Sequence, residues 1–164
     1  LDKETTDNVE VTIACAVQAL NIYYLPDFIK WKLQEGFRKI NMYPFGAGTV
    51  NFHFVYWPAH LNVKTLPTWF KEECRKKYEE FYPWLEENWE LCIPSWHKEK
   101  VTYEQWREND YGIKRLQGMI SFMESDDWSN RLTEMQEFLG LCDKQRGISF
   151  EETFPEMKDI FKDV

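Results

Sequence analysis

Hydrophobic positions in the first third of the chain follow the pattern of two strands separated by a helix. The segment from Val9 to Leu20 is mostly apolar, and it is rich in β-branched residues from Val9 to Val17, which predicts a strand buried on both faces, as in a parallel sheet. Residues 50–57 are again mostly β-branched or aromatic, which predicts a second strand that ends at Pro58. Between the two, residues 25–36 have the start signal, apolar stripe and terminal glycine of a helix.

A strand, a helix and a strand in this order are typical of a βαβ unit, with a loop or short strand at residues 37–45 and a turn at residues 46–48. Such a unit is not stable alone, because parallel strands need cover on both faces and neighbours at both edges. Either the later helices cover the sheet or the chain is the later half of a larger α/β protein, and a first residue that is not methionine favours the second interpretation.

We therefore expect an α/β fold that contains a partial (half) parallel α/β barrel sheet at residues 1–66. A helical C-terminal extension at residues 67–164 is expected to pack on it and to complete a single structural unit.

From Leu66 onwards the apolar residues recur at helical spacing, so we expect only helices there. The longest covers residues 66–82 and kinks or restarts at Pro83. A second helix runs from residue 102 toward residue 123, and a third follows Asp126 or Asp127. Thr102–Gln105 and Ser149–Glu152 have the form of capping boxes, which open helices. Gly112 and Gly118 are weak points within the helix that begins at residue 102, and Gly147 is expected to end the helix before it.

Composition narrows the classes of function. The formal net charge of −8 argues against binding a nucleic acid through its phosphates. No apolar run approaches the ~20 residues that a membrane helix needs. Aromatic residues make up 17% of the chain, with 8 Trp, 8 Tyr and 12 Phe, and such rings can fill a core, line a pocket or form a partner surface.

The 4 cysteines are scattered and form no CxxC pair. Because the N-terminus has no secretory signal, we expect free thiols, a cytoplasmic location and no disulfide. The spacing from His53 to His60 is not that of a metal motif, and His97 is remote, so no metal site is expected.

The best candidates for a binding site are Gln18, Asn21 and His60, which sit at or just after the C-terminal ends of the two expected strands. Parallel strands present these ends at one edge of the sheet, where α/β proteins bind ligands, so the three side chains should converge. The structural alternative is that Asn21 caps a turn and Gln18 is solvated. His53 points away from its two phenylalanine neighbours, toward another layer or a barrel interior.

Three separated motifs resemble the C-terminal half of twitch-domain radical SAM proteins, a group common in phage and marine sequences. They are VQALNIYYLPDFIKW at residues 17–31, PAHLNVKTLP at residues 58–67 and LCDKQRGISFEETFPEM at residues 141–157. The family has a partial α/β barrel, in which an N-terminal CxxxCxxC loop holds a 4Fe–4S cluster that reduces S-adenosylmethionine to a 5′-deoxyadenosyl radical. This chain lacks that cysteine motif.

The resemblance implies that the chain is the C-terminal portion of a radical S-adenosylmethionine-like enzyme, inactive alone and without a cofactor of its own. Gln18, Asn21 and His60 would face S-adenosylmethionine or the substrate in the complete protein. Its partner would be the missing N-terminal half, or a second copy paired through an exposed sheet edge. The alternative is a stand-alone aromatic-rich ligand- or protein-binding module, and neither interpretation involves nucleic acid or membrane.

Overall fold

The computed structural model describes residues 13–37, 50–93, 101–109 and 112–162. Two parallel strands, β1 (Ile13–Val17) and β2 (Val50–Phe54), pair from Ile13 opposite Val50 to Val17 opposite Phe54. The predicted parallel pairing is therefore confirmed. Residues 9–12 of the first predicted strand, nearly all of the predicted loop at 37–45, the turn at 46–48 and His97 lie outside the described residues.

The remaining described elements are helical. The α-helices are α1 (Leu25–Gln34), α2 (Thr68–Glu87), α3 (Tyr103–Glu108), α4 (Ile113–Glu124), α5 (Leu132–Arg146) and α6 (Phe150–Thr153). Short 3-10 turns join them: η1 (Ile22–Tyr24), η2 (Ala59–Leu61), η3 (Val63–Thr65), η4 (Trp89–Cys92), η5 (Ser129–Arg131) and η6 (Pro155–Met157). The described chain is thus a mostly helical α/β protein with a two-stranded parallel sheet.

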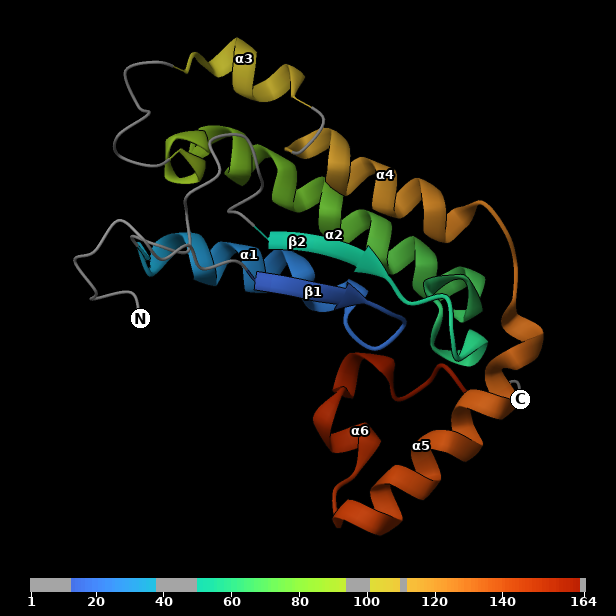
Figure 1. The fold of residues 1–164 in the computed structure, drawn as a ribbon. Coiled ribbons are helices and arrows are strands. Elements are labelled where there is room, and N and C mark those ends of the chain that lie inside the picture. Colours follow the sequence, from blue (N-terminus) through green and yellow to red (C-terminus); the bar gives the residue numbers. More distant parts are fainter. Residues whose placement is uncertain (1–12, 38–49, 94–100, 110–111, 163–164) are drawn as a thin grey trace.

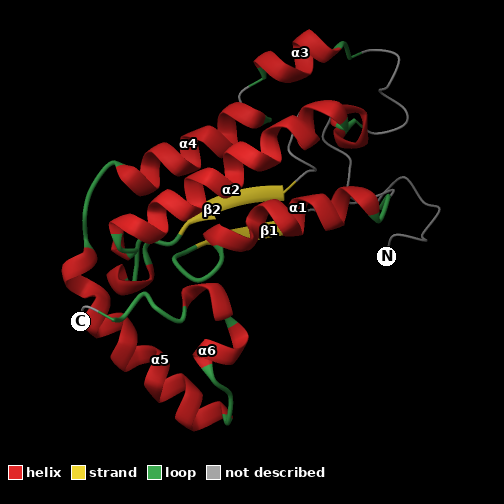
Figure 2. Ribbon diagram, turned by 180° about the vertical axis from the view of Figure 1, so that it is seen from behind, coloured by secondary structure: helices red, strands yellow, loops and turns green. Residues whose placement is uncertain are grey.

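The helices cover only one face of this sheet. Helices α1 and α2 lie behind the strands in Figure 1 and in front of them in the reverse view of Figure 2, while α4 runs above the strands beside α2 in both views. The side chains on that face, such as Val17 and Phe52, are buried. On the other face Ala14, Ala16, Asn51 and His53 are exposed. The prediction of a first strand buried on both faces is therefore wrong, because in the described residues the helical layer packs on one side alone.

Several predicted helix ends are confirmed. The side chain of Thr102 accepts a hydrogen bond from the Gln105 amide while the Gln105 side chain accepts one from the Thr102 amide, which completes the expected capping box. Gly147 ends α5 with φ at 64°, a left-handed conformation that glycine adopts without a steric penalty. Ser149 caps α6 by accepting from the Glu152 amide, but no reciprocal bond to the Glu152 side chain is present among the described residues, so the capping box predicted there is confirmed only in part.

Other boundaries differ from prediction. The single helix expected from residue 102 to residue 123 is two helices, because α3 ends at Glu108, where Asn109 is extended, and α4 begins after Gly112, whereas Gly118 stays inside α4. Pro83 lies within α2, which continues through it to Glu87. Asp127 accepts a hydrogen bond from the amide of Ser129, the first residue of η5, so it supports the start of that 3-10 turn, whereas α5 begins at Leu132 without a side-chain cap.

Two general properties follow from the described residues. No helix among them is both long enough and apolar enough to cross a membrane. The four cysteine sulfurs are not bonded to one another, and burial raises the pKa of Cys74 to about 12, which keeps that thiol protonated.

Candidate functional site

The candidate site is the C-terminal edge of the parallel pair, together with the sheet face that the helices leave open. At this edge the segments that follow β1 and β2 lie side by side. The Ala19 amide donates to the Leu61 carbonyl over 2.9 Å, one step beyond the bond from the Val55 amide to the Val17 carbonyl, also 2.9 Å. The backbones next to Gln18 and next to His60 are therefore adjacent, as the sequence predicted for strand ends of a parallel pair.

Asn21 uses its side chain to complete the outer edge of β1. Its amide nitrogen Nδ2 donates to the Ala16 carbonyl over 2.8 Å, and its oxygen Oδ1 accepts from the Gln18 amide over 2.9 Å. In a parallel ladder alternate residues point toward and away from the partner, and Val17 points toward β2, so Ala16 and Gln18 point outward. The carboxamide thus takes the place of one residue of a neighbouring strand.

We expect Asn21→Ala to lower the free energy of unfolding by about 1–2 kcal/mol, because it removes two hydrogen bonds worth roughly 0.5–1.5 kcal/mol each. Urea unfolding followed by circular dichroism measures this loss. The matched variant Asn21→Asp keeps the acceptor for Gln18 but places a carboxylate against the Ala16 carbonyl, so it should be no better than alanine. An alanine variant as stable as the original chain would contradict the edge-capping role.

Gln18 contributes its backbone to this turn. Its carbonyl accepts hydrogen bonds from the amides of Asn21 and Ile22, each over 3.1 Å, and its side chain is half-buried. Asn21 and Gln18 are thus brought together, but by a local turn. A role for either side chain in cofactor binding stays a prediction.

His60 lies on η2 and makes its described side-chain contacts with α5. Its ring centroid is 5.1 Å from that of Phe138, and its Nδ1 is 3.9 Å from a carboxylate oxygen of Glu134, which Arg131 also holds. Its other nitrogen, Nε2, is buried and finds no hydrogen-bond partner among the described residues. Although His60 belongs to the same edge as Gln18, its side chain serves the contact between that edge and the C-terminal helices. A role in cofactor binding stays a prediction here too.

Asn62 is a residue of this edge that the sequence analysis did not single out. Its fully buried side chain donates to the Val55 carbonyl over 2.9 Å and accepts from the Lys64 amide over 3.0 Å. It therefore joins the end of β2 to η3 and fixes the loop that carries His60. An asparagine whose oxygen bonds the amide two residues later is a recognisable turn signal, so this role was open to prediction.

The outer edges of the two strands differ. On β2, Arg115 of α4 donates to the outward carbonyl of Phe52 over 3.0 Å, so a charged side chain blocks that edge. On β1, Asn21 occupies only the C-terminal end. Within the described part of the chain, the outward amides of Ala14 and Ala16 and the carbonyl of Ala14 have no partner. The edge of β1 is therefore open to another strand.

The open face of the sheet carries two polar side chains beside two small ones. Asn51 is paired in register with Ala14, and His53 with Ala16. The alanines leave space next to a carboxamide and an imidazole, which together offer hydrogen-bond donors and acceptors to a ligand lying on the sheet. Among the described residues no group of three or more histidine, cysteine or acidic side chains is placed to hold a metal ion.

No protein family model, curated protein or solved structure matches the chain. The likeness to twitch-domain radical SAM proteins therefore remains a prediction from three sequence motifs. The structural information that bears on function is the geometry of the sheet.

Proposed function

We propose that this chain is the C-terminal portion of a radical S-adenosylmethionine-like enzyme, in which the open face of the β1–β2 pair forms part of the interior of a larger parallel α/β barrel. The observation that carries the proposal is the one-sided helical layer. In an α/β barrel the helices surround the outer face of the sheet, while the inner face meets the opposite strands and the ligand. The exposed face with Ala14, Ala16, Asn51 and His53 suits that inner position.

The difference between the two strand edges supports the same proposal. In a barrel portion that lacks its earlier strands, the outer edge of the last strand should be covered. The outer edge of the first strand should instead have backbone amides and carbonyls without partners. The Arg115 contact closes the edge of β2, whereas among the described residues the backbone groups of Ala14 and Ala16 at the edge of β1 have no partner beyond Asn21. The earlier strands would then join the sheet beside β1.

The roles of the side chains follow from their positions. Asn51 and His53 would offer hydrogen bonds to a ligand inside the barrel, at the face that the helices leave open. Asn21 and Asn62 would hold the loops at the C-terminal edge, where S-adenosylmethionine or the substrate would enter, and Gln18 and His60 would border that entrance. The cluster would be held by residues outside this chain, because no CxxxCxxC occurs in it.

The second candidate is a stand-alone binding module, and one observation favours it. Trp57 has 81% of its surface exposed and its neighbour Tyr56 has 56%, at the loop that follows β2. Adjacent exposed aromatic rings of this size are uncommon on a protein that binds nothing there. In this case the open edge of β1 would pair with a second copy of the chain.

The proposal predicts that the chain of 164 residues cannot hold a 4Fe–4S cluster, whereas a chain extended through its upstream reading frame can. The upstream frame should encode CxxxCxxC. After anaerobic reconstitution, iron analysis and absorbance should give about four irons per extended chain and no cluster on the shorter one, because three thiolates must hold the cluster.

The control is the extended chain with the three motif cysteines replaced by alanine, which should also lack iron. A cluster bound by the shorter chain, or an upstream frame without the cysteine motif, would contradict the proposal.

A further inference from the structure

A lysine ammonium lies within reach of two aromatic rings near the C-terminal end of β2. The ammonium nitrogen of Lys64 is 4.6 Å from the centroid of the Phe122 ring and 5.4 Å from that of Trp128. Both distances fall within the ~6 Å over which a ring face attracts a cation. The Tyr56 ring packs edge to face on Phe122, with centroids 5.7 Å apart. We name Tyr56, Phe122 and Trp128 the aromatic box.

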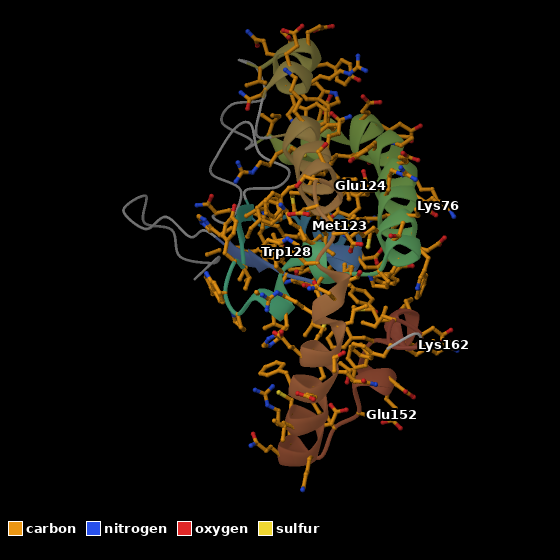
Figure 3. The ribbon with its side chains drawn as sticks, turned by 90° about the vertical axis from the view of Figure 1, so that its right-hand side faces the viewer. Lys76, Met123, Glu124, Trp128, Glu152 and Lys162 are labelled. Carbon is orange, nitrogen blue, oxygen red and sulfur yellow. The ribbon has the colours of Figure 1, made fainter. Side chains whose placement is uncertain are left out.

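The walls of the aromatic box are held by contacts that do not involve the Lys64 side chain. The backbone amide of Trp128 donates to the backbone carbonyl of Lys64 over 3.1 Å, and the indole N–H donates to the Asp126 carboxylate over 2.9 Å. Phe122 packs against Phe54 with centroids 4.2 Å apart. Trp128 follows Met123 and Glu124 at the end of α4, in the segment that leads to α5 (Figure 3). The box should therefore persist when the lysine side chain is removed.

The electrostatics of the aromatic box suit an ammonium group whose own N–H donors are not needed. Within the described part of the chain, the Lys64 ammonium makes no hydrogen bond and no close ion pair; it lies over the two rings and is attracted by the nearby Asp126 carboxylate. The hydrogen bond from the Trp128 indole lowers the pKa of Asp126, which keeps a negative charge beside the box at neutral pH. A site of this kind accepts an ammonium that carries methyl groups in place of hydrogens.

We propose that the aromatic box is a binding site for an alkylated organic ammonium ion, and that Lys64 is its built-in occupant until such a ligand displaces it. The site goes beyond the proposed radical S-adenosylmethionine function. Phe54, which supports the box, lies on the helix-covered side of β2, whereas the proposed barrel interior is the opposite face. Failure of one proposal therefore leaves the other standing.

The probe for the experiment is choline, titrated into nitrogen-15-labelled protein at constant ionic strength. The signal is the indole N–H resonance of Trp128, assigned by its loss in Trp128→Phe. Lys64→Ala removes the internal competitor and should bind choline at least about tenfold more tightly than the original chain, a factor that corresponds to 1.4 kcal/mol. Lys64→Arg keeps a cation over the rings and should bind as weakly as the original chain.

The matched ligand is the neutral carbon analogue of choline, in which a tert-butyl group replaces the trimethylammonium group. It should leave the Trp128 resonance of Lys64→Ala unchanged. Equal shifts by both ligands, or no saturable shift by choline, would overturn the proposal. Should Lys64→Ala fail to fold, the original chain decides the question. Choline must then move its Trp128 resonance at higher concentration while the neutral analogue does not, and any other result overturns the proposal.

Discussion

Replacing Tyr78 with alanine is expected to lower the free energy of unfolding by about 3–5 kcal/mol, the range for truncating a large buried aromatic side chain. Tyr78 is fully buried on α2, and its hydroxyl donates to the Ile22 carbonyl over 2.9 Å. Burial raises its pKa well above the ordinary value, so the hydroxyl stays a donor at any physiological pH. Alanine would therefore leave a cavity at the contact between α2 and η1 and an unpaired carbonyl within it.

The matched variant Tyr78→Phe separates the two parts of that loss. It keeps the ring and removes only the hydroxyl, so it should cost about 1–3 kcal/mol for the unsatisfied Ile22 carbonyl. Chemical unfolding of the two variants and the original chain measures both values. If both variants lost the same free energy of unfolding, the ring would contribute nothing to stability, which would contradict its full burial in the core.

Replacing Trp106 with alanine is expected to lower the free energy of unfolding by a similar amount, about 3–5 kcal/mol. Trp106 on α3 is fully buried, with ring centroids 6.2 Å from Trp89 and 6.1 Å from Tyr103. These three rings attach the short helix α3 to η4, the turn that follows α2. Without the central ring, α3 should lose its packing, and thermal unfolding should begin at a lower temperature.

Trp106→Phe provides a control, because the buried indole N–H of Trp106 has no hydrogen-bond partner in the part of the chain that the structure describes. The substitution therefore removes no hydrogen bond, and its cost should be that of lost volume alone, about 1–2 kcal/mol. A phenylalanine variant as unstable as the alanine variant would indicate that the indole nitrogen bonds a group that the structure does not place next to it.

The local features of the fold could be predicted because short-range chemistry determines them. The Thr102–Gln105 capping box, the left-handed Gly147 and the parallel strand pair each follow from residues close in sequence or from strand composition. The continuation of α2 through Pro83 could not be predicted from local sequence. The buried side chains of Phe81 and Leu85 on either side of Pro83 keep the helix packed despite the lost hydrogen bond.

The candidate site was predicted only in part, because side-chain direction depends on long-range contacts. Adjacency of the segments at Gln18 and His60 follows from parallel strands. Asn21 turns to the β1 edge through local hydrogen bonds with Ala16 and Gln18. The direction of His60 toward Glu134 and Phe138 instead depends on α5, which is far away in sequence. The Arg115 contact to β2 has no local signal for the same reason. The apolar run of β1 suggested burial on both faces, because alanines count as apolar even where they are exposed.

Amide hydrogen exchange at Ala14 and Ala16 tests the central claim, that the sheet continues beyond β1, most directly. In the chain of 164 residues these outward amides have no described partner and should exchange quickly, whereas the Val55 amide, bonded to the Val17 carbonyl, should be protected. In the chain extended upstream, the account predicts that Ala14 and Ala16 become protected at least about a hundredfold while Val55 changes little. Equally fast exchange of Ala14 and Ala16 in both chains would contradict it.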